Sequence, residues 1–302
     1  MTALALQTPR PAPAGGVPYL GHGIGLRRPH YDAIVETVEA EATRHEIDFF
    51  EILVENYMSF GGRPRAVLER LLRSRPFVLH GVGLSIGGPD PLSEDYLTHL
   101  ERLIDATGAP WFSDHLCSSG GFGVEYHDLL PLPFTEAALD HVSRRVERIQ
   151  RRFPIPFALE NPSYYIELGA SEMSELEFIQ RLVARTGVKL LLDVNNVYVN
   201  SQNHGYEPRA FIEGIPPEAV VQIHMAGHER LPEVIIDTHG APAVPEVLAL
   251  YAHTLEHTGP VSTLVEWDND IPELPVLLEE NRKVRAVARE TLGEVEVAAW
   301  TR

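Results

Sequence analysis

The sequence repeats one unit eight times: a short apolar run rich in β-forming residues, followed by a segment with helical spacing. The runs cover 19–26, 47–56, 76–83, 110–117, 155–161, 188–196, 220–227 and 262–268. Between them, apolar residues recur every three or four positions, as at Leu97, Leu100, Leu103 and Ile104. Eight strands alternating with helices over about 280 residues are typical of a (β/α)₈ TIM barrel, an α/β fold. In that fold every strand ends at the same face.

A doubly wound open sheet is the alternative for this alternation. The segment GHGIGLRRPHYD at the first turn lacks the G-x-G-x-x-G spacing of dinucleotide-binding sheets, which favours the barrel. We expect residues 1–18, rich in Pro and Ala, to form a disordered tail and 19–302 to form one barrel domain. Two loops are long, 118–134 and 227–244. Both follow strand C-termini, where barrel enzymes build their sites.

Charge and cysteine content narrow the class of protein. The net charge is −18, from 25 basic and 43 acidic residues, so the surface repels nucleic acids and anionic membranes. The single cysteine, Cys117, excludes an intramolecular disulfide framework and fits a reducing cytoplasm. No secretory signal and no apolar run of roughly 18 residues is visible. We therefore expect a cytoplasmic protein without a nucleic-acid or membrane partner.

Side chains that bind metals gather at the ends of these runs and in the loop 227–244. Carboxylates packed at one barrel mouth would repel each other, and bound cations would remove that repulsion. Imidazole combined with carboxylate favours first-row transition metals over Mg²⁺ or Ca²⁺. Four histidines and four acids exceed the needs of one ion, so we expect two or three metals bridged by a carboxylate such as Glu160. The candidates are His80, His115, Glu160, Asp193, His224, Asp237, His239 and Glu266.

Other polar residues near the run ends have less specific signals. The side-chain oxygen of Asn196 is a possible metal contact, although asparagine often simply ends a strand as a turn. Arg27 fits either a substrate carboxylate or a salt bridge at the rim, and both remain open. We take Arg27, Glu55 and Asn161 as candidate substrate-binding residues. His22 and His228 are candidates to orient ligands by hydrogen bonds.

Ten motifs, in order over about residues 19–285, resemble the multinuclear non-heme iron-dependent oxidases. This family includes the methanobactin biosynthesis oxidase and was long catalogued only as a family of unknown function. The motifs are GIGLRRPHYD, ILVENYM, LHGVGLSIGG, SDHLCSSGG, HDLLPLPFT, LENPSYY, LDVNNVYVNSQNHG, IHMAGH, IDTHG and LVEWDND.

The resemblance implies a TIM barrel that holds two or three irons in mixed Fe²⁺/Fe³⁺ valence and uses O₂ as co-substrate. It implies oxidation of residues, often cysteine, in a ribosomally made precursor peptide that a small partner protein presents. Glu160, Asp193 and His224 are then the candidate catalytic residues. The implied ligands are His80, His115, Glu160, Asp193, Asn196, His224, Asp237, His239 and Glu266.

Two other classes compete with this interpretation. The first is a divalent-metal isomerase or phosphoesterase on a similar barrel, like xylose isomerase or endonuclease IV. No lysine stands at a run end, as an isomerase would usually require, and a net charge of −18 disfavours an endonuclease. The second is a non-catalytic carrier of metal or peptide. Iron content and O₂ consumption separate these classes from an oxidase.

Overall fold

The computed structural model describes residues 16–39, 46–58, 61–166, 168–169 and 171–297. Most of the expected tail, residues 1–15, therefore lies outside the described residues. Val17, which the sequence placed in that tail, is buried and packs with Leu20, Phe49 and Trp111.

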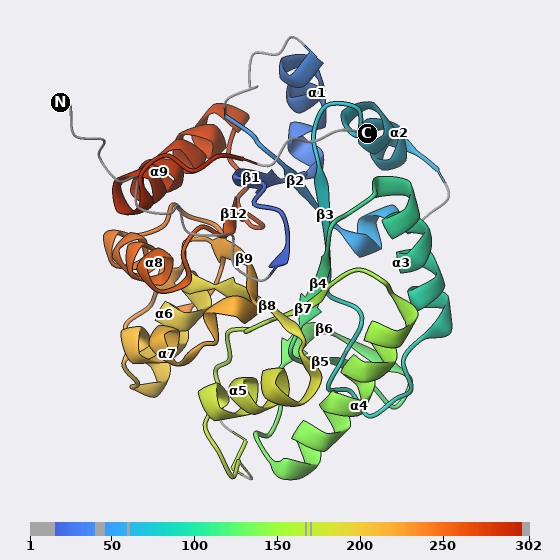
Figure 1. Ribbon diagram of the computed structural model, residues 1–302, viewed down its shortest axis with the longest axis vertical. Coiled ribbons are helices and arrows are strands. Elements are labelled where there is room, and N and C mark those ends of the chain that lie inside the picture. Colours follow the sequence, from blue (N-terminus) through green and yellow to red (C-terminus); the bar gives the residue numbers. More distant parts are fainter. Residues whose placement is uncertain (1–15, 40–45, 59–60, 167, 170, 298–302) are drawn as a thin grey trace, which may run out of the picture.

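The described chain forms a closed barrel of eight parallel strands, as the alternating pattern predicted. Their order is β1-β12-β9-β8-β7-β4-β3-β2, and β2 pairs with β1 to close the ring (Figure 1). Each strand lies inside one predicted apolar run, so the runs mark the barrel correctly. The strands are β1 (His22–Gly25), β2 (Phe50–Leu53), β3 (Phe77–Gly81), β4 (Phe112–His115), β7 (Phe157–Glu160), β8 (Lys189–Asp193), β9 (Val220–Met225) and β12 (Ser262–Val265).

Helices surround the strands as an outer ring (Figure 1). Several begin at a side chain that caps the helix: Ser93 accepts from the amide of Tyr96, and Thr135 from that of Ala138. The helices are α1 (Tyr31–Glu39), α2 (Arg63–Leu71), α3 (Glu94–Thr107), α4 (Glu136–Arg152), α5 (Glu175–Thr186), α6 (Val194–His204), α7 (Pro208–Gly214), α8 (Pro245–Thr258) and α9 (Leu274–Leu292), with short 3₁₀ turns at η2 (Arg28–His30), η3 (Val54–Tyr57) and η4 (Pro217–Ala219).

Two apolar runs end as helices rather than as strands. The run 47–56 ends in η3, which carries Glu55, and the run 188–196 passes into α6, which carries Asn196. Asp193 caps α6 because its carboxylate accepts a hydrogen bond from the Asn196 amide. A strand that turns directly into a helix keeps these polar residues at the barrel mouth.

The interior of the barrel is built in layers that follow the period of two along each strand. Val78, Ala158 and Leu191 belong to an apolar cluster inside the barrel. Two residues later on the same strands stand His80, Glu160 and Asp193, all buried. On each of these strands, an apolar side chain that points into the barrel is therefore followed two residues later by a side chain of a metal-binding type.

Both long loops contain small antiparallel hairpins. The loop 118–134 forms β5 (Ser118–Gly121) with β6 (Val124–Leu130), and the loop 227–244 forms β10 (Glu229–Arg230) with β11 (Ile235–Ile236). Within the described residues, no helix combines the length and the apolar character needed to cross a membrane.

Candidate metal centre

Metal-binding side chains from several strands meet inside the barrel mouth. Strand register brings two pairs together: His115 lies beside Glu160 on β4 and β7, and Asp193 lies beside His224 on β8 and β9. Three groups of ligand atoms result, each with all members within 4.8 Å of one another. Glu160 belongs to the first two groups and Glu266 to the last two. The groups are His80, His115 and Glu160; Glu160, Asp193, His224 and Glu266; and His239, Glu266 and Asp268.

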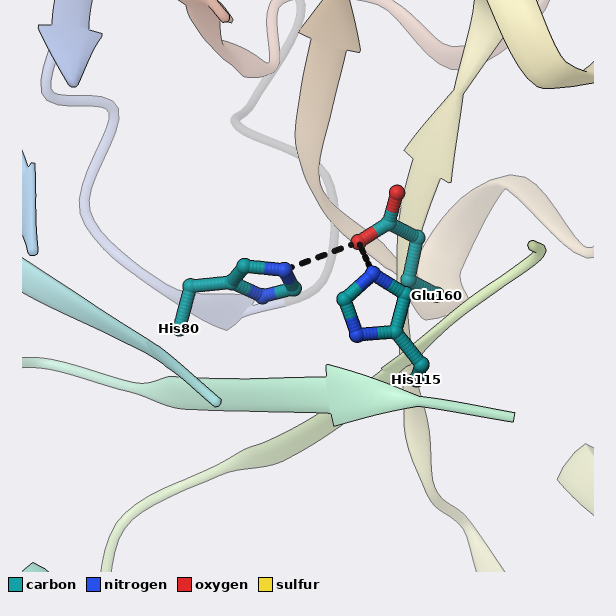
Figure 2. A group of neighbouring side chains, drawn as sticks. All are labelled: His80, His115 and Glu160. Atoms are coloured by element: carbon teal, nitrogen blue, oxygen red, sulfur yellow. Dashed lines mark ion pairs between the residues drawn. The ribbon is translucent and has the colours of Figure 1, made fainter. Parts of the chain in front are cut away.

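The first group joins two imidazoles to one carboxylate (Figure 2). The Nε2 atoms of His80 and His115 lie 3.2 and 3.3 Å from Oε2 of Glu160. Nδ1 of His115 lies 3.1 Å from the carbonyl oxygen of Gly81, which can only accept. Nδ1 of His80 lies 2.9 Å from Oγ of Ser113, whose own hydrogen points to the Leu79 carbonyl. Both rings therefore carry hydrogen on Nδ1 and direct a lone pair from Nε2 toward Glu160.

The second group centres on His224. Its Nε2 lies 3.0 Å from Oε2 of Glu51, and its Nδ1 lies 3.0 Å from Oε2 of Glu266 and 4.0 Å from Oε1 of Glu160. Glu51 is fully buried on β2 and also accepts a hydrogen bond from the side-chain amide of Gln222. A carboxylate that holds the proton of Nε2 leaves Nδ1 free to bind a metal.

The third group depends on the loop 227–244. Nε2 of His239 lies 2.8 Å from Oδ1 of Asp237, and Nδ1 lies 3.2 Å from Oε2 of Glu266. His239 has a φ of 44°, in the left-handed region that few non-glycine residues adopt. Its carbonyl accepts from the amide of Asp268 at 2.8 Å, which holds this conformation and brings Asp268 into the group.

The charges of these groups are strongly coupled. Burial raises the pKa of Glu160 well above its usual value and that of Asp193 to about 7, so without a cation both tend to hold protons. Burial also lowers the pKa of His115 to about 4 and keeps that ring neutral. Burial opposes the charge of His224, but Glu51 and Glu266 outweigh it and raise its pKa well above 6.5. The carboxylates thus attract positive charge into the centre.

Ligand atoms without hydrogen-bond partners show that the centre fits metal ions. Such atoms are rare in protein interiors because each one costs about 1–3 kcal/mol. Cations held among them would satisfy all of them at once, and imidazole with carboxylate suits first-row transition metals. Five buried atoms in this region make no hydrogen bond of acceptable geometry, although three of them lie close to an ion-pair partner. They are Oε2 of Glu160, Oδ2 of Asp193, Oδ1 of Asn196, Nδ1 of His224 and Nε2 of His239.

Asn196 and Asn161 use their amides differently. The nitrogen of Asn196 donates to the carbonyl of Asn161, and its oxygen has no partner, so that oxygen remains available to a metal. Asn161 exchanges hydrogen bonds with the backbone of Asp193 in both directions, at 3.0 Å each. Asn161 therefore ties β7 to the end of β8, between two candidate ligands.

Arg27 and Glu55 border the centre without joining its three groups. The guanidinium of Arg27 lies 3.0 Å from Glu266 and 2.5 Å from Asp268, and its Nη1 is buried without a partner. Oε1 of Glu55 accepts from the amides of Val82 and Gly83 and from the hydroxyl of Tyr96, while Oε2 is buried without a partner. The rim salt bridge expected as one alternative for Arg27 is present.

The structure also shows residues that our sequence reasoning missed. Glu51 was not considered, although an acid two residues after Phe49 in an apolar run is a usable signal. Asp268, the last residue of the run 262–268, is likewise absent from the predicted ligands although it joins the third group. His22 was wrongly considered as an orienting residue: it hydrogen-bonds Tyr251, which contacts Thr263, at the start of the strands. His228 contacts Asn195, which donates to Asp237, so its position is compatible with the expected orienting role.

Solved structures that resemble this chain share its fold at low identity. A xylose isomerase-like TIM barrel protein from Mycobacterium smegmatis in complex with magnesium has a TM-score of 0.61 at 13% identity, covering 93% of this chain and 99% of its own. Endonuclease IV from Thermus thermophilus has a TM-score of 0.56 at 18% identity, covering 89% and 99%. At these identities the likeness concerns the barrel alone.

Sequence relatives are much closer. A UPF0276 protein of Anaeromyxobacter sp. (strain Fw109-5) is 44% identical over 280 residues, which are 93% of this chain and 97% of the relative. Another from Caulobacter vibrioides (strain NA1000 / CB15N) is 42% identical over 269 residues, 89% and 94% of the two chains. A family described as RiPP precursor modification enzyme MbnB/TglH/ChrH, where RiPP denotes a ribosomally made and then modified peptide, matches residues 21–289. This chain therefore belongs to the family of MbnB/TglH/ChrH RiPP precursor modification enzymes.

Proposed function

We propose that the protein is a multinuclear iron-dependent oxidase that uses O₂ to modify residues, above all cysteine, of a ribosomally made precursor peptide. The observation that carries this proposal is the set of three adjacent groups of candidate ligands, which share Glu160 and Glu266. Within the described residues these groups contain histidine and carboxylate but no cysteine, and Cys117 is buried outside them. A ligand set of this kind suits iron and leaves thiolate binding to the substrate.

Each candidate ligand has a defined role in this proposal. His80, His115 and Glu160 would hold one ion, and Glu160, Asp193, His224 and Glu266 a second, with Asn196 offering its free oxygen. His239, Asp237, Glu266 and Asp268 would complete a third position. Two to three irons of mixed Fe²⁺/Fe³⁺ valence would supply the activation of O₂. Glu51 keeps the proton of His224 on Nε2, and Ser113 and the Gly81 carbonyl do the same for Nδ1 of His80 and His115.

The peptide would approach from the barrel mouth. Arg27 and Glu55 each keep one buried polar atom without a partner, and these atoms are our candidates for contacts to the peptide. Asn161 would act on the substrate through Asp193, whose backbone it holds. In this proposal a small partner protein presents the peptide, and the enzyme works in the cytoplasm.

The first experiment is elemental analysis of protein purified without oxygen. We expect two to three irons per chain, and consumption of O₂ when a cysteine-containing precursor encoded beside the gene is added. Stoichiometric zinc or manganese that persists after iron-supplemented expression would overturn the proposal in favour of isomerase or hydrolase chemistry. Absence of O₂ consumption with a bound peptide would instead indicate a carrier.

Variants of the shared ligands sharpen this test. Glu160→Ala and His224→Ala should lose iron and turnover together, because Glu160 serves two groups and His224 has carboxylates on both ring nitrogens. Glu69→Gln is the matched control, since Glu69 pairs with Arg65 on the exposed face of α2. Full iron and full turnover in either alanine variant would refute the site assignment.

A further inference from the structure

A cavity that is lined by none of the candidate ligands has a chemistry of its own. Its volume is about 590 Å³, in the range of sites that bind small ligands or single side chains. Apolar side chains make up much of its wall, among them Phe134, Met173, Leu176 and Phe211. The cavity is lined by the end of the β6 loop, the loop after β7, the start of α5 and the turn from α6 to α7.

One acid in the wall of this cavity has a carboxyl oxygen without a hydrogen-bond partner. Glu175, the first residue of α5, is buried, and its Oε2 has no hydrogen-bond partner. Tyr164 supplies a hydrogen bond to the carboxyl group, and burial raises its pKa to about 8. An orphaned oxygen in an apolar wall costs free energy unless something else donates to it. No residue of the metal centre does so.

The charge of the lining determines which donor fits. Among the described residues that line the cavity, two are carboxylic acids, Glu175 and Glu207, and none is lysine or arginine. An anionic ligand would meet only like charge, whereas a cation would let Glu175 ionise and form an ion pair. Apolar walls with one buried acid suit a long methylene chain that ends in an ammonium group. A single free oxygen favours an ammonium over the two-pronged guanidinium of arginine.

The cavity is within reach of a peptide bound at the metal centre. Tyr164, which lines it, follows Glu160 by four residues, so their Cα atoms are at most about 14 Å apart at about 3.6 Å per residue. The intervening Ser163 donates to Asp237, which contacts His239 of the third group. Tyr164 stacks on His204 with ring centroids 4.2 Å apart. A few extended residues of peptide span that distance.

We infer that this cavity is a binding pocket for a lysine side chain of the precursor peptide, with Glu175 as its ionic partner. The pocket would anchor the peptide a few residues away from the residue that reacts. The assignment of the lysine to a precursor peptide rests on the proposed function, whereas the preference of the pocket for an alkylammonium group does not.

The test uses n-hexylamine as the probe and hexan-1-ol as its uncharged counterpart. Binding to the full metal-loaded chain at pH 7 is measured by ligand-observed NMR titration, and repeated after chelation to exclude amine bound to metal. We expect hexylamine to bind at least tenfold more tightly than hexanol in both forms. Equal affinity of the two probes, or loss of the amine preference on chelation, would overturn the inference.

Variants distinguish an ion pair with Glu175 from a general effect of negative charge in the cavity. Glu175→Gln should weaken hexylamine binding at least tenfold and leave hexanol binding within twofold, which also reports an intact cavity. Glu207→Gln, which removes an exposed carboxylate from the same lining, should change neither. Glu175→Asp keeps the charge and should lie between wild type and Glu175→Gln. Equal weakening by the Glu175 and Glu207 variants would refute an ion pair with Glu175.

The binding preference for hexylamine is measured independently of iron content and of turnover. If hexylamine shows no preference while the protein holds iron and consumes O₂ with peptide, the pocket assignment fails alone. If the amine binds as expected but the protein holds zinc, the proposed oxidase function fails and the pocket stands.

Discussion

At the residue scale, the metal centre depends on side chains that do not touch metal. Each imidazole in the first two groups has its non-ligating nitrogen held by an oxygen: Gly81 for His115, Ser113 for His80 and Glu51 for His224. These contacts select the tautomer and fix the ring plane before any ion binds. We expect Glu51 to have the largest effect among them, because it is a fully buried carboxylate.

Replacement of Glu51 tests this role. We expect Glu51→Gln to weaken metal binding at the His224 position by roughly 10–100-fold, the usual cost of losing such a partner. Metal competition with a chelator, read as iron retained per chain, measures the effect. Glu69→Gln on the surface should retain wild-type iron. Unchanged retention in Glu51→Gln would show that the tautomer of His224 is set elsewhere.

The buried acid Glu175 gives a pH dependence with a defined sign. Its pKa is raised by burial from 4.5 to about 8, so the folded state holds a proton that the unfolded state releases above about pH 4.5. Stability should therefore fall as pH rises through this window. Relative to Glu175→Gln, the wild type should lose about 3 kcal/mol of unfolding free energy between pH 5 and pH 8. Parallel denaturant curves for the two proteins across these pH values would contradict the assignment.

At the element scale, the loop 227–244 supplies His239 to the third group and places Asp237 beside it. It leaves β9 at Gly227, forms the β10–β11 hairpin and delivers Asp237 and His239 to the mouth. A Cβ atom at Gly227 would collide with the backbone carbonyl of Ala241, so the two ends of the loop are packed without room for a side chain.

Substitution at Gly227 should therefore displace the whole loop. We expect Gly227→Ala to lower stability by about 1–3 kcal/mol, as overpacking does, and to reduce binding at the His239 position more than at the His80 position. Denaturant unfolding and metal stoichiometry report the two effects. Gly61→Ala is the control, because a Cβ there meets nothing within 4 Å. Equal stability of both variants would show that the loop relaxes freely.

At the scale of the whole molecule, the barrel concentrates acidic side chains at its mouth. The chain has a net charge of −18, and Glu51, Glu160, Asp193 and Glu266 are buried at one end of the barrel with Asp237 and Asp268 beside them. Arg27 is in contact with two of these acids. Bound cations would offset most of the remaining repulsion, so metal binding and folding should be linked.

Removal of metal measures that linkage. With metal at 100 times its dissociation constant, binding to the folded state contributes about 2.7 kcal/mol, which corresponds to about 4 °C in melting temperature for a chain of this size. We expect chelation to lower the melting temperature of the wild type by at least that amount. Glu160→Ala, which binds less metal, should respond much less. An equal change in melting temperature for both proteins would show that stability does not depend on metal bound at this centre.

The order of elements was predictable because it depends on local pattern. Hydrophobic runs of strand length that alternate with helical spacing permit few arrangements, and all eight runs contain a barrel strand. Histidines and acids at the run ends, such as His115 and Glu160, could be placed at one mouth because parallel strands of a barrel end at one face. The sequence alone thus determined the fold and predicted most of the candidate ligands that the barrel brings together.

Tertiary structure decided how those ligands are shared. Strand register places His115 beside Glu160 and Asp193 beside His224, and no local pattern encodes which strand is the neighbour. Contacts across the barrel also bring Glu51 to His224, 173 residues away, and give Tyr164 and Glu175 a common cavity. Such contacts arise only when distant segments pack, because proximity in space, unlike periodicity along the chain, is a property of the folded whole.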